Sequence, residues 1–370
     1  MLVGVPREIK KQEGRVGLTP AAVREYVAHG HEVVVETAAG AGIGADDAAY
    51  ARAGARIAAT AEDIYAAAGM IVKVKEPQPQ EWRRLRAGQI LFAYLHLAPD
   101  PEQTRGLLDS GVTAVAYETV SEGHALPLLA PMSEVAGRLS IEAAAQALRA
   151  HNGGPGLLLG GVPGVAPARV VVLGGGVVGT QAARMALGLG AEVSIVDRSL
   201  PRLRQLDDLF AGRLRTRFST RDAIEEEIRH ADVVVGSVLV PGASAPRLIT
   251  RPMLALMKPR SVLIDVAIDQ GGCFETSHPT THAEPTFEVD GVIHYCVANM
   301  PGAVPLTASH ALNHATLPYG LALAEGGTRA ILENPALRAG LSTHNGQLTS
   351  RPVSESLGIA YVPPEQALAS

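Results

Sequence analysis

Short hydrophobic runs alternate with helical stretches through the first third of the chain. The hydrophobic runs predict strands at Leu2–Pro6, Glu32–Glu36, Ile71–Lys75, Ile90–His96 and Thr113–Ala116. The stretches between them, such as Ala21–His29 and Ala61–Ala68, have the composition and spacing of helices. Strands that alternate with helices are typical of a parallel sheet in an α/β domain. The first third therefore predicts one such domain.

A second alternating series follows a long helix and a loop. The helix is predicted from about Met132 to Ala150, and the Gly- and Pro-rich stretch Asn152–Pro167 predicts the loop. The strands of this series are predicted at Val170–Leu173, Val193–Val196, Val233–Gly236, Val262–Val266 and Ile293–Val297. After about Pro305 the pattern returns to helix, with weak strand signals in the tail.

The two series predict two α/β domains, each a doubly wound parallel sheet. We expect a Rossmann domain over residues 131–304 that is inserted into a discontinuous domain made of residues 1–130 and 305–370. Because ligands favour domain interfaces, we expect the active site in the cleft between the domains.

Composition narrows the class of protein. Hydrophobic residues make up 47% of the chain and aromatic residues only 4%, so the cores are expected to be aliphatic, as in buried parallel sheets. The net charge of −5 argues against nucleic acid or an anionic membrane as the main partner.

The stretch Gly291–Ala324 has no Asp, Glu, Lys or Arg, but its prolines, asparagines and histidines argue against a membrane span. Cys273 and Cys296 form no CxxC pair, which favours a reducing cytoplasm.

A glycine motif follows the predicted strand Val170–Leu173. The run from Gly174 to Gly179 fits G-x-G-x-x-G and leads into a predicted helix, Thr180–Gly188. Gly174 is expected to allow a tight turn, Gly176 the close approach of a pyrophosphate, and Gly179 close packing of helix and strand. The amino end of the helix suits phosphate groups. The alternative reading of three glycines is an ordinary flexible turn.

Asp197 ends the next predicted strand, at the spacing of a carboxylate that binds the adenosine ribose hydroxyls. Because a carboxylate repels a 2′-phosphate, it favours NAD over NADP. Arg198 and Arg202 leave the opposite preference open.

Four polar residues follow or end predicted strands, where ligands gather in parallel sheets. They are Arg15, Lys75, His96 and Asp269. Each has an ordinary structural alternative: Arg15 as a solvated charge, Lys75 as one of two lysines that flank a strand, and His96 as a core histidine. For Asp269 the competitor is Asp265, which lies inside a predicted strand and is expected to make a structural contact.

Six motifs in chain order resemble the alanine dehydrogenase family. They are VGVPREIKKQEGRVGLTP, VKVKEPQ, AYLHLA, VLGGGVVG, DVAIDQGG and VANMPGAVP, and they extend over nearly the whole chain. The chain is similar, more distantly, to the NAD-binding subunit of proton-translocating transhydrogenase and to saccharopine dehydrogenase. The resemblance implies reversible oxidative deamination of L-alanine to pyruvate and ammonium, with NAD as the hydride acceptor.

The resemblance also implies roles for individual residues. Arg15 and Lys75 would bind substrate, a role that suits a guanidinium fork and a second cation. His96 and Asp269 would be catalytic, and a histidine titrates in the range that proton exchange near neutral pH requires. With the glycine motif, the implied NAD contacts are Ser133, Gly174, Gly176, Val177, Val178, Gly179, Asp197, Arg202, Ser219, Val238, Leu239, Val266, Ala267, Ile268, Asp269, Val297, Ala298, Asn299 and Met300.

The chain departs from the family pattern in places. His278 stands where the family often has Arg, which leaves its contact with the cofactor open. An acid-plus-histidine pair that binds a metal in some members is Ala322 and Gly326 here, so we expect no metal site. The resemblance implies a homo-oligomer, typically a hexamer. A transhydrogenase-type subunit without a small substrate and a catalytically silent NAD-binding protein are the competing hypotheses.

Overall fold

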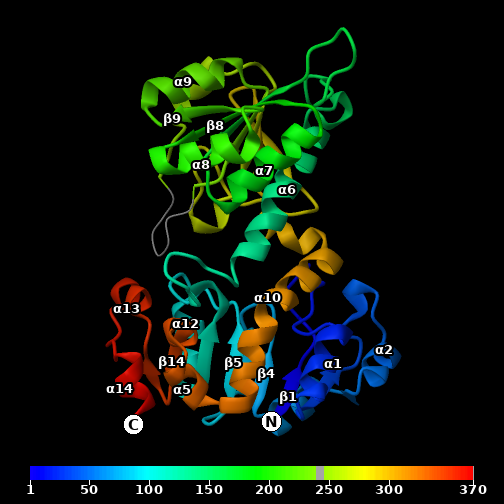
Figure 1. Cartoon of the computed structure of the whole chain (residues 1–370), viewed down its shortest axis with the longest axis vertical. Helices are drawn as coiled ribbons and strands as arrows, with labels where there is room; N and C mark the ends of the chain where they lie inside the picture. The colour runs from blue at the N-terminus through cyan, green and yellow to red at the C-terminus, as the bar shows by residue number, and fades with distance from the viewer. Residues whose placement is uncertain (239–245, 370) are drawn as a thin grey trace. The chain divides into compact units, whose positions relative to one another are not determined.

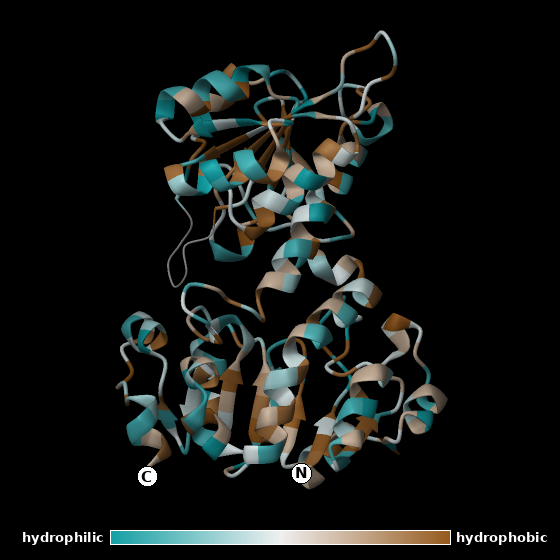
Figure 2. Cartoon of the chain, in the orientation of Figure 1, coloured by the Kyte–Doolittle hydropathy of each residue, from teal (hydrophilic) through white to brown (hydrophobic). Residues whose placement is uncertain are grey.

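The computed structural model describes residues 1–238 and 246–369. The chain divides into two compact units (Figure 1). Unit 1 consists of Met1–Met132 and Val304–Ser370, and unit 2 consists of Ser133–Ala303. Each unit is built around one sheet, and the central strands of both sheets are strongly hydrophobic (Figure 2).

The sheet of unit 1 has eight strands in the order β15-β14-β6-β5-β4-β1-β2-β3. The strands are β1 (Leu2–Val5), β2 (Glu32–Glu36), β3 (Arg56–Ala58), β4 (Met70–Val72), β5 (Ile90–Ala93), β6 (Thr113–Ala116), β14 (Leu341–His344) and β15 (Gln347–Leu348). The first six strands of the chain, β1 to β6, are parallel to one another. At one edge, β14 pairs antiparallel with β6 and with β15.

The sheet of unit 2 has seven strands in the order β12-β13-β11-β10-β7-β8-β9. The strands are β7 (Arg169–Leu173), β8 (Glu192–Asp197), β9 (Arg215–Phe218), β10 (Val233–Gly236), β11 (Val262–Asp265), β12 (Thr286–Val289) and β13 (Val292–Tyr295). All pairs are parallel except β12 with β13. The chain reverses its direction across the sheet between β7 and β10, the point where doubly wound folds bind ligands.

Helices connect the strands of each unit. Those of unit 1 are α1 (Pro20–Ala28), α2 (Asp47–Arg52), α3 (Ala61–Ala67), α4 (Pro79–Trp82), α5 (Pro101–Ser110), α10 (Pro305–Gly326), α11 (Thr328–Glu333), α12 (Pro335–Gly340), α13 (Arg351–Leu357) and α14 (Pro364–Leu368). Unit 2 contains α7 (Val177–Gly188), α8 (Leu200–Phe210) and α9 (Arg221–His230), together with most of α6 (Ala130–Ala147). Side-chain caps fix several starts: Thr19 accepts from Ala22 at α1, and Thr60 from Asp63 at α3.

The predicted α/β class with two doubly wound parallel sheets is confirmed, and each mostly parallel sheet also contains an antiparallel hairpin at one edge. Two hairpins add the antiparallel strands. Asn345-Gly346 joins β14 to β15 with φ of 46° and 78°, and Asp290-Gly291 joins β12 to β13 with φ of 49° and 81°. Two consecutive residues with positive φ form the hairpin turn that matches the twist of paired strands.

Two of the predicted strands end three residues earlier than expected. β4 ends at Val72 rather than Lys75, and β5 ends at Ala93 rather than His96. Beyond these strand ends, side-chain carboxylates accept the hydrogen bonds of backbone amides, as the carbonyl groups of a neighbouring strand do within the sheet. Glu8 accepts from the Val74 amide, and Glu118 accepts from the amides of Leu95 and His96.

The long helix also ends earlier than predicted. α6 ends at Ala147 rather than Ala150, and a short 3₁₀ turn follows at Ala150–Asn152. In the described part of the chain, no helix is both long and apolar enough to cross a membrane.

Candidate active site

The glycines in the turn of unit 2 have different surroundings. Gly174 has a φ of 100°, and a Cβ placed on Gly179 would lie 1.9 Å from the Gly174 carbonyl oxygen. The predicted tight turn and close packing are therefore confirmed. Among the described residues, no atom lies within 4 Å of a Cβ placed on Gly176, so the space beside this glycine is open. This open approach at the start of α7, which has twelve residues, fits a dinucleotide phosphate.

Asp197 ends β8 and faces this turn. Its two carboxylate oxygens accept from the amide of Gly175 at 2.7 Å and from that of Ser199 at 2.8 Å. A carboxylate has about four acceptor positions, so these two bonds orient the group and leave acceptor capacity for ribose hydroxyls. The residues present therefore fit a dinucleotide.

Arg202 braces the same turn from α8. Its guanidinium donates to the Gly175 carbonyl at 2.6 Å and to the Thr180 hydroxyl at 2.7 Å. A third bond, at 3.0 Å, goes to the side chain of Gln205. These three bonds hold Arg202 against the turn. Thr180, which sequence reasoning passed over, is thus part of the same structure.

The other implied NAD contacts in unit 2 follow β9, β10, β11 and β13 or begin the two neighbouring helices. Ser219 donates its amide to the Asp197 carbonyl at 3.0 Å, and Val238 lies beside Gly174. Val266, Ala267, Ile268 and Asp269 follow β11, and Val297, Ala298, Asn299 and Met300 follow β13. Val177 and Val178 begin α7, and Ser133 lies near the start of α6. Leu239 lies outside the described residues.

Asp269 and Asp265 have different surroundings. Asp269 is exposed, and its carboxylate accepts from the amide of Asn299 at 3.3 Å. Asp265 is fully buried and accepts from the Cys273 amide at 2.9 Å and from the Ser277 hydroxyl at 2.6 Å. The structural contact predicted for Asp265 is confirmed. His278, whose cofactor contact was left open, packs its ring on Phe287, with ring centroids 3.7 Å apart.

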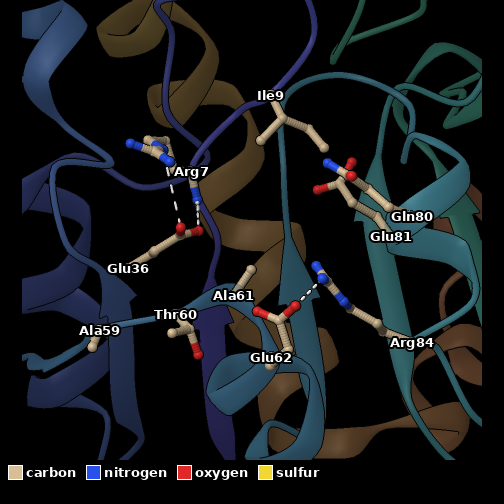
Figure 3. A pocket seen from close by; sticks show the side chains of 10 residues that line it. All are labelled: Arg7, Ile9, Glu36, Ala59, Thr60, Ala61, Glu62, Gln80, Glu81 and Arg84. Carbon is tan, nitrogen blue, oxygen red and sulfur yellow. Dashed lines mark hydrogen bonds and ion pairs between the residues drawn. The ribbon is translucent and has the colours of Figure 1, made fainter.

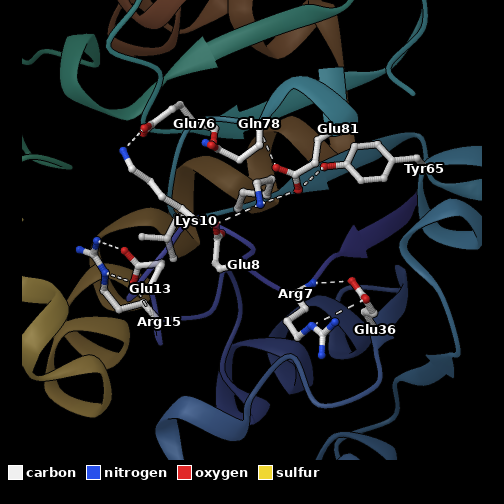
Figure 4. Close-up of polar contacts among 12 residues, drawn as sticks. Arg7, Glu8, Lys10, Glu13, Arg15, Glu36, Tyr65, Glu76, Gln78 and Glu81 are labelled. Atoms are coloured by element: carbon white, nitrogen blue, oxygen red, sulfur yellow. Dashed lines mark hydrogen bonds and ion pairs between the residues drawn. The ribbon is translucent and has the colours of Figure 1, made fainter. Parts of the chain in front are cut away.

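In unit 1, Arg15 is not a solvated charge. Its side chain is 2% exposed and forms a fork with Glu13, with Nε at 2.7 Å and Nη2 at 2.5 Å from the carboxylate oxygens (Figure 4). Nη1 lies 3.2 Å from the sulfur of Met132. Burial lowers the pKa of Arg15, but the pairing with Glu13 outweighs it, so the pKa is raised and the charge is kept. A guanidinium has five N–H groups, of which this fork uses two.

The two lysines after β4 are both buried but differ in their contacts. Lys73 is fully buried between Glu8 at 3.0 Å and Glu81 at 2.9 Å. Lys75 is 9% exposed, and its charge lowers the pKa of the neighbouring Glu76. Glu76 also pairs with Lys10 (Figure 4). The sequence left open which of the two lysines has a structural role. The two carboxylate partners of Lys73 assign that role to Lys73.

His96 is not a core histidine, because its side chain is 46% exposed. It has a φ of 48°, and its amide donates to Glu118 at 2.7 Å. The ring Nδ1 lies 3.8 Å from the same carboxylate. The imidazole also stacks on the ring of Tyr94, with centroids 5.9 Å apart and planes 5° apart. Backbone and ring contacts therefore both define where His96 lies.

Sequence reasoning missed the acidic partners of these side chains. Glu8 and Glu13 lie in the loop that follows the parallel strand β1, and Glu118 lies in the short 3₁₀ helix Tyr117–Thr119 that follows β6. The rule that selected Arg15, Lys75 and His96 applied equally to them. Their short distance in sequence from strand ends was the available signal.

A separate shallow pocket of about 290 Å³ lies at the ends of β1, β2 and β3 in unit 1 (Figure 3). Its charged lining includes Arg7, Glu36, Glu62 and Arg84, and none of the predicted site residues lines it. The Arg84–Glu62 and Arg7–Glu36 pairs lie within it. Over residues 1–238 and 246–369, no group of three or more His, Cys, Asp or Glu side chains is placed to hold a metal ion.

Comparisons with known proteins agree with these features. The family models "Alanine dehydrogenase/PNT, N-terminal domain" and "Alanine dehydrogenase/PNT, C-terminal domain" match residues 4–136 and 140–351. The alanine dehydrogenase of Halomonas elongata is 60% identical over 98% of this chain and 98% of its own. A solved L-alanine dehydrogenase is 50% identical with a TM-score of 0.94 over 97% of this chain and 99% of its own. A transhydrogenase from Sinorhizobium meliloti is 28% identical with a TM-score of 0.80 over 95% of this chain and 99% of its own. The chain therefore belongs to the alanine dehydrogenase/PNT family.

Proposed function

We propose that the chain is an L-alanine dehydrogenase, an oxidoreductase that converts L-alanine and water reversibly to pyruvate and ammonium with NAD. The observation that carries this proposal is the 60% identity, over 98% of both chains, to an alanine dehydrogenase. Retention of Arg15, Lys75, His96 and Asp269 supports it at the level of residues.

Arg15 and Lys75 bind the carboxylate and the carbonyl oxygen of pyruvate in this proposal. Both are nearly buried cations, at 2% and 9% exposure, so their attraction for an anion is weakly screened. The Glu13 fork holds the Arg15 guanidinium in one orientation. A guanidinium held in place loses less conformational entropy when a carboxylate binds.

His96 and Asp269 handle water and protons. When L-alanine is oxidised, its α-hydrogen leaves as hydride and an imine remains; bound NAD supplies the hydride acceptor. Water then adds to the imine carbon, and the carbinolamine formed loses ammonia. His96, half-exposed and oriented by Glu118, accepts the proton of the attacking water and returns it to the departing nitrogen. Asp269 orients the water and stabilises the imino cation.

We assign NAD to the glycine turn, with Asp197 on the adenosine ribose. Both Asp197 oxygens are oriented by backbone amides, and a carboxylate there disfavours a 2′-phosphate. Arg202 is engaged by Gly175, Thr180 and Gln205, which supports a bracing role over a phosphate-binding role. The remaining contacts proposed are those already named around the turn and after β9, β10, β11 and β13.

We further propose a cytoplasmic homo-oligomer, a hexamer by family resemblance. Both cysteines are buried and unbridged, which suits a reducing compartment. The loop 153–168 has no charged residue, and Leu158, Val162 and Val165 are 53–63% exposed. Apolar side chains clustered on one exposed loop are a common feature of subunit interfaces.

The first test measures NADH formation from NAD⁺ with L-alanine, followed by a screen of other L-amino acids. We expect L-alanine to be the preferred substrate. His96→Ala and Asp269→Ala are expected to reduce kcat by about a hundredfold or more, the usual range for a lost acid–base group. His230→Ala, which changes an exposed histidine at the end of α9 in unit 2, serves as the control. Full turnover in both site variants would contradict the assigned roles.

The second candidate is a transhydrogenase-type subunit, which the match to the Sinorhizobium meliloti protein favours. Such a subunit would bind NAD(H) without a small substrate and would pass hydride to a partner's NADP. L-Alanine-dependent NADH formation by the chain alone excludes it. Binding of NADH without any amino-acid-dependent turnover would instead support this candidate or a silent NAD-binding protein.

A further inference from the structure

We propose that Glu8 is a positioning residue for Lys75, which it holds through the backbone amide of Val74 and the side chain of Lys73. The proposal rests on the substrate-binding role proposed above for Lys75. Glu8 itself makes no contact with substrate in this proposal. It fixes the segment that presents the lysine.

The first support is the way the sheet ends before Lys75. The parallel ladder between β1 and β4 ends at the pair Gly4 and Ile71. Two residues beyond the end of β4, the Val74 amide donates to Glu8 Oε1 at 2.7 Å. On the side of β5, the Val74 carbonyl accepts from the Tyr94 amide at 3.1 Å. Glu8 thus supplies an acceptor where the ladder with β1 has ended, and Lys75 is the next residue.

The second support is a buried ion cluster around the same segment (Figure 4). The Lys73 ammonium lies 3.0 Å from Glu8 Oε2 and 2.9 Å from Glu81 Oε1. All three side chains are at most 2% exposed. Glu81 Oε2 also accepts from the Gln78 amide at 2.8 Å. The Lys73 ammonium therefore joins two carboxylates. One binds the backbone amide just before Lys75, and the other binds the backbone amide three residues after it.

The third support is energetic. Removing three charged groups from water is costly, and such clusters often stabilise a fold less than apolar residues of similar volume would. Burial raises the pKa of Glu8, against the effects of Lys73 and the Val74 amide. Burial lowers the pKa of Lys73, but the two carboxylates outweigh it, so the pKa is raised. Since stability alone explains this cluster poorly, the fixed geometry it gives to residues 73–78 is its better explanation.

The same cluster connects Lys75 to the segment that carries Arg15. Glu8 and Arg15 both lie between β1 and α1. Lys10, from that connection, pairs with Glu76 beside Lys75. The two proposed substrate cations are therefore presented by segments that are tied to each other at two points.

The test compares Glu8→Gln with Glu36→Gln. Val74 and Lys73 donate to different oxygens of Glu8, and a glutamine replaces one of these oxygens with an NH₂ donor, so one of the two bonds is lost. Glu8→Gln should raise the KM for pyruvate about tenfold or more and change the KM for NADH less than about twofold. Glu36 is a matched control, because it is 7% exposed and accepts from the adjacent Arg7 amide at 2.8 Å without contacting residues 73–78. Its variant should leave both KM values within about twofold.

Glu8→Asp serves if Glu8→Gln does not fold, because it keeps the charge but shortens the reach by one methylene. Hydrogen exchange of the Val74 amide, measured on either folded variant, should be faster than in the wild type. Unchanged exchange, or equal increases in KM for pyruvate and for NADH, would overturn the proposal. A wild type inactive with L-alanine would refute the proposed function instead, and Val74 exchange would still decide whether Glu8 holds this segment.

Discussion

Gly176 and Gly179 lie three residues apart in one turn, yet different physical limits apply to them. At Gly179 the limit is the chain itself, because a Cβ there would meet the Gly174 carbonyl at 1.9 Å and Ser237 Oγ at 2.8 Å. At Gly176 no atom of residues 1–238 or 246–369 lies within 4 Å of the added carbon, and its φ of −67° suits any residue. The fold therefore requires a glycine at position 179, and we propose that a bound dinucleotide requires one at position 176.

Three glycine-to-alanine variants separate these limits. Gly179→Ala should lower the free energy of unfolding by about 1–3 kcal/mol, the usual cost of overpacking. Gly176→Ala should leave stability within about 0.5 kcal/mol of the wild type but weaken NADH binding about tenfold or more. Gly188→Ala, in the same helix and open on all sides, is the control and should bind NADH normally. Urea unfolding and NADH fluorescence titration measure the two effects; normal NADH affinity in Gly176→Ala would contradict the proposed approach of the pyrophosphate.

At the scale of elements, β13 is tied to a neighbouring loop by a histidine. His294 is fully buried, and its Nδ1 lies 3.0 Å from the Val292 carbonyl. Because a carbonyl only accepts, Nδ1 carries the hydrogen, and Nε2 of the neutral ring accepts from the Thr276 hydroxyl at 2.7 Å. Burial lowers the pKa of His294 below the ordinary value of 6.5.

This lowered pKa gives a signed prediction for stability. Below pH 6.5 the unfolded chain binds a proton at this histidine that the folded chain does not, so stability falls as the pH drops from 6.5 toward the lowered pKa. His294→Gln should be less stable than the wild type at pH 7.5, by about 1–3 kcal/mol, and should lose less stability on acidification to pH 5. His230→Gln, at an exposed position, should follow the wild-type profile. Unfolding free energies across this range decide the matter; parallel profiles for His294→Gln and the wild type would refute the prediction.

The central strands could be predicted from sequence because burial on both faces leaves continuous aliphatic runs. β6 and β10 have the predicted bounds. Strands at or next to the sheet edges lack such runs: β9, at one edge, reads Arg-Thr-Arg-Phe, and β14, next to the edge strand β15, reads Leu-Ser-Thr-His. For β12 to β15, the Asp290-Gly291 and Asn345-Gly346 pairs were the available signals, since they form hairpin turns.

The sequence proposes residues for the candidate site but does not predict the contacts that these residues make. Position after a strand selected Arg15, Lys75 and His96, because parallel strands end at one edge of the sheet. Nothing in the sequence pairs Arg15 with Glu13 rather than with a neighbouring acid. Nor does periodicity show that Lys73 lies buried between Glu8 and Glu81, because that depends on how two loops pack.

At the scale of the whole molecule, the loop 153–168 combines two properties: its sequence has no charged residue, and its structure exposes large apolar side chains. It projects from unit 2 (green in Figure 1), and an isolated bridge between Val162 and Val165 gives it a defined turn. Val162 is 53% exposed, Val165 59% and Leu158 63%. A loop that keeps these side chains in water forgoes about 1.5–3 kcal/mol of burial for each large one, which association would recover.

Val162→Glu should therefore weaken self-association, because burying a carboxylate without a partner costs more than burying valine gains. We expect the dissociation constant of the oligomer to rise about tenfold or more, so that smaller species appear at micromolar concentration in sedimentation velocity. Leu209→Glu is the matched control, since Leu209 is 48% exposed on α8, outside the loop, and its variant should sediment as the wild type does. The loop faces solvent in the described structure, so Val162→Glu should also keep the wild-type unfolding free energy of the separated subunit within about 0.5 kcal/mol. An unchanged sedimentation profile in Val162→Glu, with the wild type oligomeric, would place the interface elsewhere on the surface.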